Sequence, residues 1–169
     1  MDKNFYITTP IYYPSAKPHM GHAYSSIIAD FFARFKRIDD FNVFFLTGTD
    51  EHGLKIERSA KAKRIDTLKF CDEISQTFRE LSKILNLTNT DFIRTTENRH
   101  KQSVQSLWQE LEKNDDIYLS KYSGWYSVSD EAFYSNDEIE ENNGKRIAIS
   151  SKSTVEWMDE ESYFFRLSK

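Results

Sequence analysis

Cysteine, glycine and proline are scarce in this sequence, which has one cysteine, five glycines and three prolines among its 169 residues. The lone Cys71 excludes an internal disulfide framework and any zinc site built from several cysteines. No apolar run approaches the roughly 18 residues that a membrane-spanning helix requires. The start, MDKNFYITTPIYYPS, carries an acid and two prolines where a signal peptide has an unbroken apolar stretch. We therefore expect a soluble, cytoplasmic protein with no membrane partner.

Basic residues are not in excess either. The chain has 23 lysines and arginines against 27 acidic residues, which gives a net charge of -4. This balance excludes a general electrostatic footprint for nucleic acid, although it leaves room for a local basic patch. Hydrophobic residues make up 38% and aromatic residues 15% of the chain. That content is sufficient for a packed core in one domain of ordinary size, so wholesale disorder is excluded.

The first two-thirds of the chain alternates between strand and helix patterns. NFYITT (4–9) is typical of a buried strand, and FNVFFLTGT (41–49) is typical of a parallel strand covered on both faces. TDFIRTT (90–96) predicts a third strand. Helical spacing predicts helices at about 21–37, 50–64, 66–85 and 98–114. This order predicts an α/β fold with a parallel sheet and crossover helices.

Three of these helices carry apolar stripes that we expect to face the core. The first stripe comprises Ala23, Ile27, Phe31 and Phe35, with Ile28 and Phe32 beside it. The stripe on the third helix comprises Leu68, Cys71, Ile74, Phe78, Leu81 and Leu85. The stripe on the fourth comprises Val104, Leu107, Trp108 and Leu111.

After Asp115 the sequence becomes aromatic and alternating, which predicts β structure. ENNGK (141–145) has the composition of a hairpin turn, and VEWMDEESYFFRLSK adds a further β-prone stretch. We expect a main domain at residues 1–115, a small β-rich insert at 116–160, and a return toward the main body at 161–169.

Two of the four histidines lie in one strand-to-helix turn, YYPSAKPHMGH (12–22). The carboxyl end of a first strand is where an open α/β sheet binds ligands, and the start of the next helix suits phosphate. His19 and His22 could donate hydrogen bonds to phosphoryl oxygens as negative charge develops, while Gly21 would admit a flat ligand close to the backbone. The alternative is one ordinary polar histidine and one neighbour of a helix cap. The spacing alone leaves both interpretations open.

TGTDEHG (47–53) closes the second strand, at the same end of a parallel sheet as the histidine turn. Asp50 could pair with the ammonium group of a ligand, or it could simply cap the next helix. A metal site made of Asp50, Glu51 and His52 is a poorer alternative, because adjacent residues at a helix start point in different directions.

Five blocks of the sequence resemble bacterial-type methionyl-tRNA synthetases, in the order which that family shows. They are TTPIYYPSAKPHMGHAY, FLTGTDEHGLKIE, DFIRTTENRH, SGWYSVSDEAFYS and VEWMDEESYFFRLSK, and together they extend over nearly the whole chain. HMGH matches the HIGH signature, which many class I synthetases and adenylyltransferases share, whereas the TGTDEHG and GWYSVSDEAFY blocks are much more specific. The resemblance implies the first half of a class I Rossmann-like parallel sheet with a β-rich connective insert.

The resemblance also implies a role for each matched position. His19, Gly21 and His22 would bind ATP, taken with Mg²⁺ as substrate, and the two histidines would act in catalysis. Ile11, Tyr13 and Asp50 would bind methionine, with Asp50 receiving its ammonium group. The products would be methionyl-adenylate and then methionyl-tRNA, so that the implied partners are methionine, ATP and tRNA(Met).

The sequence departs from the family in two ways. Members with a zinc knuckle have Cys-x-x-Cys in the insert, and here Ser127 and Asp130 stand at those positions. We therefore expect no zinc. The lysine-rich KMSKS loop and the anticodon-binding helices are absent, which implies that a second polypeptide or C-terminal half supplies them. The chain alone is then expected to be inactive.

Two other functions compete with the ligase. A small nucleotidyltransferase would also use H-x-G-H, and ISS (149–151) would suit its late motif, but the Asp50–His52 block has no place in that fold. A non-catalytic binding module is the other alternative, because half a Rossmann sheet leaves one edge bare.

Overall fold

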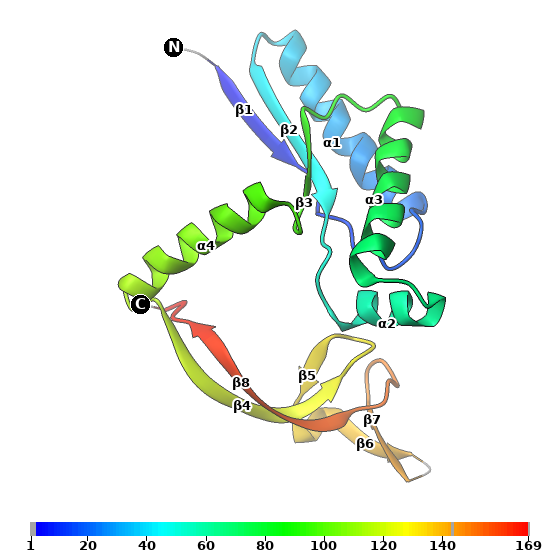
Figure 1. Cartoon of the computed structure of the whole chain (residues 1–169), viewed down its shortest axis with the longest axis vertical. Coiled ribbons are helices and arrows are strands. Elements are labelled where there is room, and N and C mark those ends of the chain that lie inside the picture. Colours follow the sequence, from blue (N-terminus) through cyan, green and yellow to red (C-terminus); the bar gives the residue numbers. More distant parts are fainter. Residues whose placement is uncertain (1–2, 143, 169) are drawn as a thin grey trace. The chain divides into compact units, whose positions relative to one another are not determined.

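The structure, a computed structural model, describes residues 3–142 and 144–168 (Figure 1). The chain divides into two compact units, Met1–Gln102 and Ser103–Lys169. The first unit holds β1 (Asn4–Thr8), α1 (Met20–Ile38), β2 (Asn42–Thr49), α2 (Leu54–Lys63), α3 (Thr67–Ile84) and β3 (Asp91–Arg94). Helix α4 (Asn98–Lys113) runs through the division, and the described part of the second unit contains five strands. The predicted α/β class and the alternation of strands and helices are thus confirmed.

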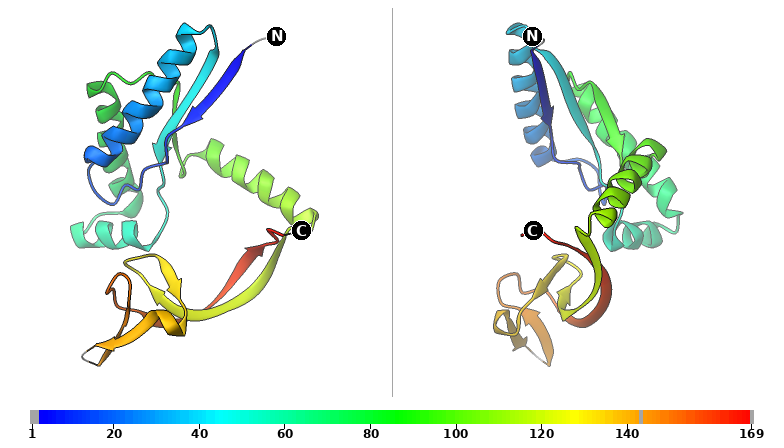
Figure 2. Two further views of the ribbon diagram at one scale, coloured as in Figure 1. Left: turned by 180° about the vertical axis from the view of Figure 1, so that it is seen from behind. Right: turned by 90° about the vertical axis from the view of Figure 1, so that its left-hand side faces the viewer.

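The sheet of the first unit is parallel, in the order β1-β2-β3. Crossovers that step in one direction across a parallel sheet, each right-handed, bring their helices to one face. The register agrees with this rule. Val43 and Phe45 of β2 pack against Ala29 and Ala33 of α1, and Phe92, opposite Thr47, packs against α3 on that same face. Figures 1 and 2 show α1 and α3 on one side of these strands.

The other face of the sheet is not covered by any described element of the first unit. Tyr6 and Phe44 stack on it with ring centroids 5.8 Å apart, and they are 61% and 43% exposed. Two predictions were therefore wrong. β1 is an edge strand that alternates between exposed and half-buried residues, and β2 is covered on one face along its first half. The apolar runs were predicted correctly as strands, but no helix or strand in the described part of the first unit lies over the Tyr6 side.

The predicted inward stripe of α1 is confirmed at Ala23 but was wrong for its large residues. The residues that face the sheet are small or polar, whereas Ile27, Phe31 and Phe35 are about half exposed or more. The buried residues are Ala23, Ser26, Ala29, Asp30 and Ala33. Small side chains let the helix approach the sheet closely. Asp30 is stabilised there because its carboxylate accepts hydrogen bonds from the backbone and hydroxyl of Thr88 and from Arg34.

The prediction of a buried apolar stripe is largely confirmed for α3 and was wrong for α4. On α3, Cys71, Ile74 and Phe78 are buried as predicted, Leu81 and Leu85 are half-buried, and Leu68 is exposed. Helix α4 has no fully buried residue, so the inward orientation predicted for Val104, Leu107 and Trp108 was wrong, and Leu111 is only half-buried. None of the helices in the described ranges is long and apolar enough to span a membrane.

The second unit is built on a long antiparallel ribbon of β4 (Ile117–Ser127) and β8 (Glu156–Phe165), with β5 (Ala132–Tyr134) at the other edge of β4. A short 3-10 turn (Asn136–Glu138) leads to the hairpin of β6 (Ile139–Asn142) and β7 (Lys145–Ala148). The predicted hairpin is confirmed by this pairing, although Asn143 of its turn lies outside the described residues, as does Lys169 of the predicted return segment. β8 is continuous through residues 160 and 161, where the sequence analysis placed a boundary.

Candidate active site at the ends of β1 and β2

The two histidines of the turn cap helix α1 together. His19 is the N-cap residue, and its Nδ1 accepts a hydrogen bond from the backbone N–H of Gly21 at 3.1 Å. Nδ1 of His22 accepts one from the backbone N–H of His19, also at 3.1 Å. A neutral imidazole whose Nδ1 is an acceptor carries its proton on Nε2. Capping therefore uses one nitrogen of each ring and leaves an Nε2–H donor on each for a ligand. The two interpretations left open by the sequence are compatible.

His22 lies against aromatic rings. Its ring centroid is 4.9 Å from that of Tyr12, 5.0 Å from that of Phe78 and 3.9 Å from that of His19. Partial burial lowers the pKa of His22, and the neighbouring His19 lowers it further. At neutral pH His22 is thus held in its neutral form, in which Nε2 remains a hydrogen-bond donor.

Gly21 makes room for the His19 ring. A Cβ at this position would lie 3.0 Å from Cε1 and 3.2 Å from Nδ1 of His19. The imidazole can therefore fold over the first turn of α1 because no side chain intervenes. This steric requirement was not foreseen from the sequence, which suggested only that Gly21 admits a ligand.

Tyr12 connects the histidine turn to the end of β2. Its hydroxyl donates to the carbonyl of His22 at 3.2 Å and lies 2.7 Å from the hydroxyl of Ser26. Its backbone N–H donates to the carbonyl of Gly48 at 2.8 Å, and its carbonyl accepts from the N–H of Asp50 at 2.9 Å. His22 and Asp50 are thus attached to one buried residue. Sequence reasoning missed this role of Tyr12, because its partners are far apart along the chain.

Asp50 does not cap α2, whose N-cap is Gly53 with no side-chain cap. The capping alternative is therefore wrong. Asp50 is half-buried, and within the ranges that the structure describes its carboxylate has no hydrogen-bond or ion-pair partner. A half-buried, unpaired carboxylate suits a cationic ligand group, because a partner lowers the free-energy cost of its partial desolvation.

Tyr13 and Ile11 flank Tyr12 and differ in environment. The Tyr13 hydroxyl oxygen lies so close to Gly53 that a Cβ there would be 2.1 Å from it. Tyr13 thereby contacts the same loop as Asp50, and it also packs against the core that contains Phe70 and Phe78. The Ile11 side chain is 42% exposed. Both residues lie in the segment between β1 and α1, next to Tyr12, whose carbonyl accepts the Asp50 N–H.

Ser127 and Asp130 lie in a hydrogen-bonded cluster of the second unit, which we call the Asp130 cluster (Ser127, Ser129, Asp130, Tyr134, Ser151 and Ser153). The Asp130 carboxylate accepts from Tyr134 at 2.8 Å, from Ser151 at 2.5 Å and from Ser153. These hydrogen bonds, led by that of Ser151, lower the pKa of Asp130. Hydroxyl groups and one carboxylate do not fit the thiolate set of a structural zinc site.

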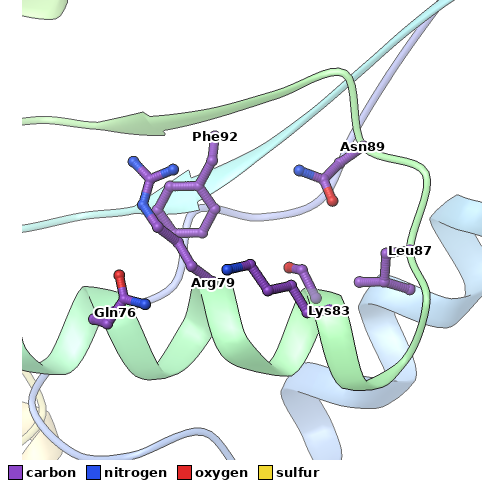
Figure 3. A pocket seen from close by; sticks show the side chains of 7 residues that line it. Gln76, Arg79, Lys83, Leu87, Asn89 and Phe92 are labelled. Carbon is purple, nitrogen blue, oxygen red and sulfur yellow. The ribbon is translucent and has the colours of Figure 1, made fainter.

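A pocket of about 300 Å³ lies elsewhere in the first unit (Figure 3). It is lined by Gln76, Arg79, Ser82, Lys83, Leu87, Asn89 and Phe92, from α3, the following loop and β3. The Arg79 guanidinium covers the Phe92 ring at 4.2 Å. None of the residues predicted to act on a ligand lines this pocket.

Comparison with known proteins identifies a family. The protein-family model described as "tRNA synthetases class I (M)" matches residues 5–145 of this chain. The methionine–tRNA ligase of Listeria monocytogenes is 53% identical over 175 residues, covering 99% of this chain and 26% of that protein. The methionine–tRNA ligase of Rickettsia felis is 50% identical over 169 residues, covering 100% of this chain and 32% of that protein.

A solved structure supports the same grouping. The methionyl-tRNA synthetase of Mycobacterium tuberculosis in complex with methionyl-adenylate matches with a TM-score of 0.91 and 45% identity, covering 98% of this chain and 33% of that chain. The chain thus spans between about a quarter and a third of the length of these proteins.

Proposed function

The chain belongs to the family of class I tRNA synthetases (M), and from this premise we propose that it is the N-terminal part of the catalytic domain of a methionine–tRNA ligase. In this proposal methionine reacts with ATP, taken with Mg²⁺ as substrate. The methionine carboxylate attacks the α-phosphorus, which forms methionyl-adenylate and releases pyrophosphate. The methionyl group then passes to tRNA(Met).

The ATP phosphates are bound by His19 and His22 in this proposal. Support comes from the capping arrangement, since Nδ1 of each ring is engaged by the backbone and each Nε2–H is directed by a fixed ring. Donors that are already oriented stabilise the charge of a pentavalent phosphorus without reorganising. Gly21 contributes by leaving space for the His19 ring and for the adenine.

Methionine is bound on the other side of Tyr12, by Ile11, Tyr13 and Asp50. The unpaired carboxylate of Asp50 would receive the ammonium group in a charge-assisted hydrogen bond. Tyr12 is the observation that carries the proposal, because its backbone and hydroxyl connect the His22 turn directly to Asp50. Adenylation requires the carboxylate of the amino acid to lie next to the α-phosphate of ATP, so two binding sites that are joined through one residue suit this reaction.

The rest of the enzyme is part of the proposal. A second polypeptide or a C-terminal half would supply the KMSKS loop, the remaining wall of the methionine site and the anticodon-binding domain. We further propose a main domain at residues 1–115, a connective insert at 116–160 and a return segment at 161–169. A cytoplasmic location and the absence of zinc stay predictions.

Methionine-dependent exchange of pyrophosphate into ATP tests the proposal. The assay uses the chain completed by the residues that follow the matched segment in the Listeria monocytogenes ligase, which matches it at 53% identity. We expect exchange with methionine, little with leucine, and a loss on the order of 10²-fold or more for His19→Ala. Exchange that does not depend on methionine would favour a nucleotidyltransferase, and no exchange at all would favour a binding module.

A further inference from the structure

Glu51, the residue after Asp50, is a buried and fully paired carboxylate. Its side chain is 0% exposed. Oε1 accepts hydrogen bonds from the Thr49 hydroxyl at 2.8 Å and from Nε of Arg94 at 2.7 Å. Oε2 accepts from the Thr96 hydroxyl at 2.5 Å. A charge as deeply buried as this is stable only because every partner is a donor in good geometry.

The backbone around Glu51 is attached to the same segment, through Thr95, which lies between Arg94 and Thr96. The Glu51 N–H donates to the Thr95 hydroxyl at 2.8 Å, and the Thr95 N–H donates to the Thr49 carbonyl at 3.2 Å. Arg94 extends the connection to α3, since its Nη2 donates to Asp72 at 2.6 Å. The ends of β2 and β3 and the helix α3 are therefore joined through one carboxylate.

Asp50 lies between Tyr12 and the hydrogen-bonded residues around Glu51, which we call the Glu51 cluster (Thr49, Glu51, Arg94, Thr95 and Thr96). Its N–H donates to the Tyr12 carbonyl on one side, and Glu51 fixes the next peptide unit on the other. The two neighbouring acids thus differ sharply. Glu51 has every oxygen paired, whereas the Asp50 carboxylate has no partner among the residues that the structure describes.

We propose that Glu51 is a positioning residue for methionine: with Arg94 it fixes the main chain of residues 49–51, so that the Asp50 carboxylate faces the ammonium group. This inference rests on the proposed function. Glu51 itself contacts no substrate in it, because its side chain is enclosed. A displacement of about 1 Å at a binding group can reduce a rate by about 10²-fold, so that the orientation of Asp50 matters as much as its charge.

Glu51→Gln is the informative substitution, since it keeps the volume of the side chain. The amide nitrogen would face either Arg94, which can only donate, or the Thr96 hydroxyl, which can rotate to accept, and in both orientations the ion pair with Arg94 would be lost. In the completed ligase we expect a rise of about tenfold or more in the KM for methionine, with the KM for ATP changed less than about twofold. Arg94→Lys should act in the same direction, because lysine cannot bridge Glu51 and Asp72 through two nitrogens.

Glu140→Gln is the matched control. Glu140 is also paired with a cation at 2.7 Å, Lys152, but it lies in the second unit. This variant should leave both KM values unchanged. Combining Glu51→Gln with Asp50→Asn should cost little more than Asp50→Asn alone, because both changes act on one contact.

A second measurement separates this inference from the proposed function. In the 169-residue chain itself, Glu51→Gln should lower the hydrogen-exchange protection of the amides at 49–51 and 95 by about tenfold or more, with amides of Val43 and Phe45 unchanged. Unchanged protection at 49–51, or an equal loss of protection everywhere, would overturn the positioning role. So would equal effects on methionine and ATP. A completed ligase without pyrophosphate-exchange activity would instead count against the proposed function. The hydrogen-exchange data would still decide whether Glu51 fixes the main chain of residues 49–51.

Discussion

The side chains that begin helix α1 are the same ones that we propose for chemistry. His19 and His22 each accept a backbone N–H through Nδ1, so that each neutral ring carries its proton on Nε2. The arrangement requires neutral rings, because a protonated Nδ1 cannot accept. Helix capping and phosphate binding are thus linked through one protonation state.

Acid should loosen this turn. The pKa of His22 is lowered from 6.5 by partial burial and by His19. The unfolded chain therefore binds the proton more readily, so the contribution of His22 to stability is complete above pH 6.5 and is lost as the pH falls toward the folded pKa. NMR titration of the imidazole nitrogens should place the His22 midpoint below 6.5.

The variant His22→Asn provides the control for this prediction. Its amide oxygen can accept the His19 N–H but does not titrate, so the His19 amide, whose acceptor in the parent chain is the His22 ring, should lose its acid sensitivity. A His22 midpoint at or above the ordinary value, or equal acid sensitivity in the variant, would contradict the prediction.

Helix α1 shows what sequence pattern can and cannot give. The helix itself was predicted correctly from its period, and so were the strands and the turn that holds His19, Gly21 and His22. The face was not, because the large residues Phe31 and Phe35 form the more conspicuous stripe. Pattern alone cannot tell which neighbour a stripe packs against, and the sheet of this chain receives the small residues.

The Glu51 cluster could not be predicted for a different reason. Its partners Arg94 and Thr96 lie more than forty positions away, and single polar residues have no period that would mark them. The sequence showed Glu51 only as one acid among three adjacent polar residues.

Two substitutions on α1 check which face is inside. Ala33 is 0% exposed, so Ala33→Leu should overpack the core and reduce the free energy of unfolding by about 1–3 kcal/mol. Phe31 is 64% exposed, and Phe31→Gln should change it by less than about 0.5 kcal/mol. Urea unfolding of the chain measures both. A larger effect at Phe31 than at Ala33 would mean that the predicted stripe faces the core after all.

The Asp130 cluster should hold its segment without metal. Asp130→Ala removes the common acceptor of Tyr134, Ser151 and Ser153, and we expect a lower melting temperature. Addition of a chelator should change nothing, and elemental analysis should find no zinc. Glu161→Ala, at an exposed position of β8, is the control and should melt as the parent chain does. One zinc per chain, or melting that depends on the chelator, would refute the prediction.

At the scale of the whole molecule, the described sheet of the first unit corresponds to one half of a doubly wound parallel sheet. In the described part of the first unit, one face of the sheet carries α1 and α3, and no element of that unit covers Tyr6 and Phe44 on the other face or pairs with the outer edge of β1. The chain also spans only 26% of the Listeria monocytogenes ligase. Doubly wound folds bind ligands between two such halves.

Assayed alone, residues 1–169 should therefore be catalytically silent, with at most weak ATP affinity at the histidine turn. These residues do not include a KMSKS loop, whose lysines would supply positive charge beside the phosphates. The loss of even one contact to the negative charge of the transition state commonly reduces the rate by about 10²–10³-fold. Adding the remaining part of a relative as a separate polypeptide should restore some exchange activity. Exchange by the chain alone, at the rate of a complete synthetase, would show that the active site has been misplaced.

The outer edge of β1 has a consequence for the behaviour of this chain in solution. An unpaired strand edge offers backbone donors and acceptors to any other strand, and the strand of a second molecule is the nearest one available in a concentrated sample. Tyr6 and Phe44, stacked beside that edge, add an apolar surface to the same region. We therefore expect β1, which the sequence analysis predicted to be a buried strand, to be the site at which molecules of this chain associate in concentrated solution.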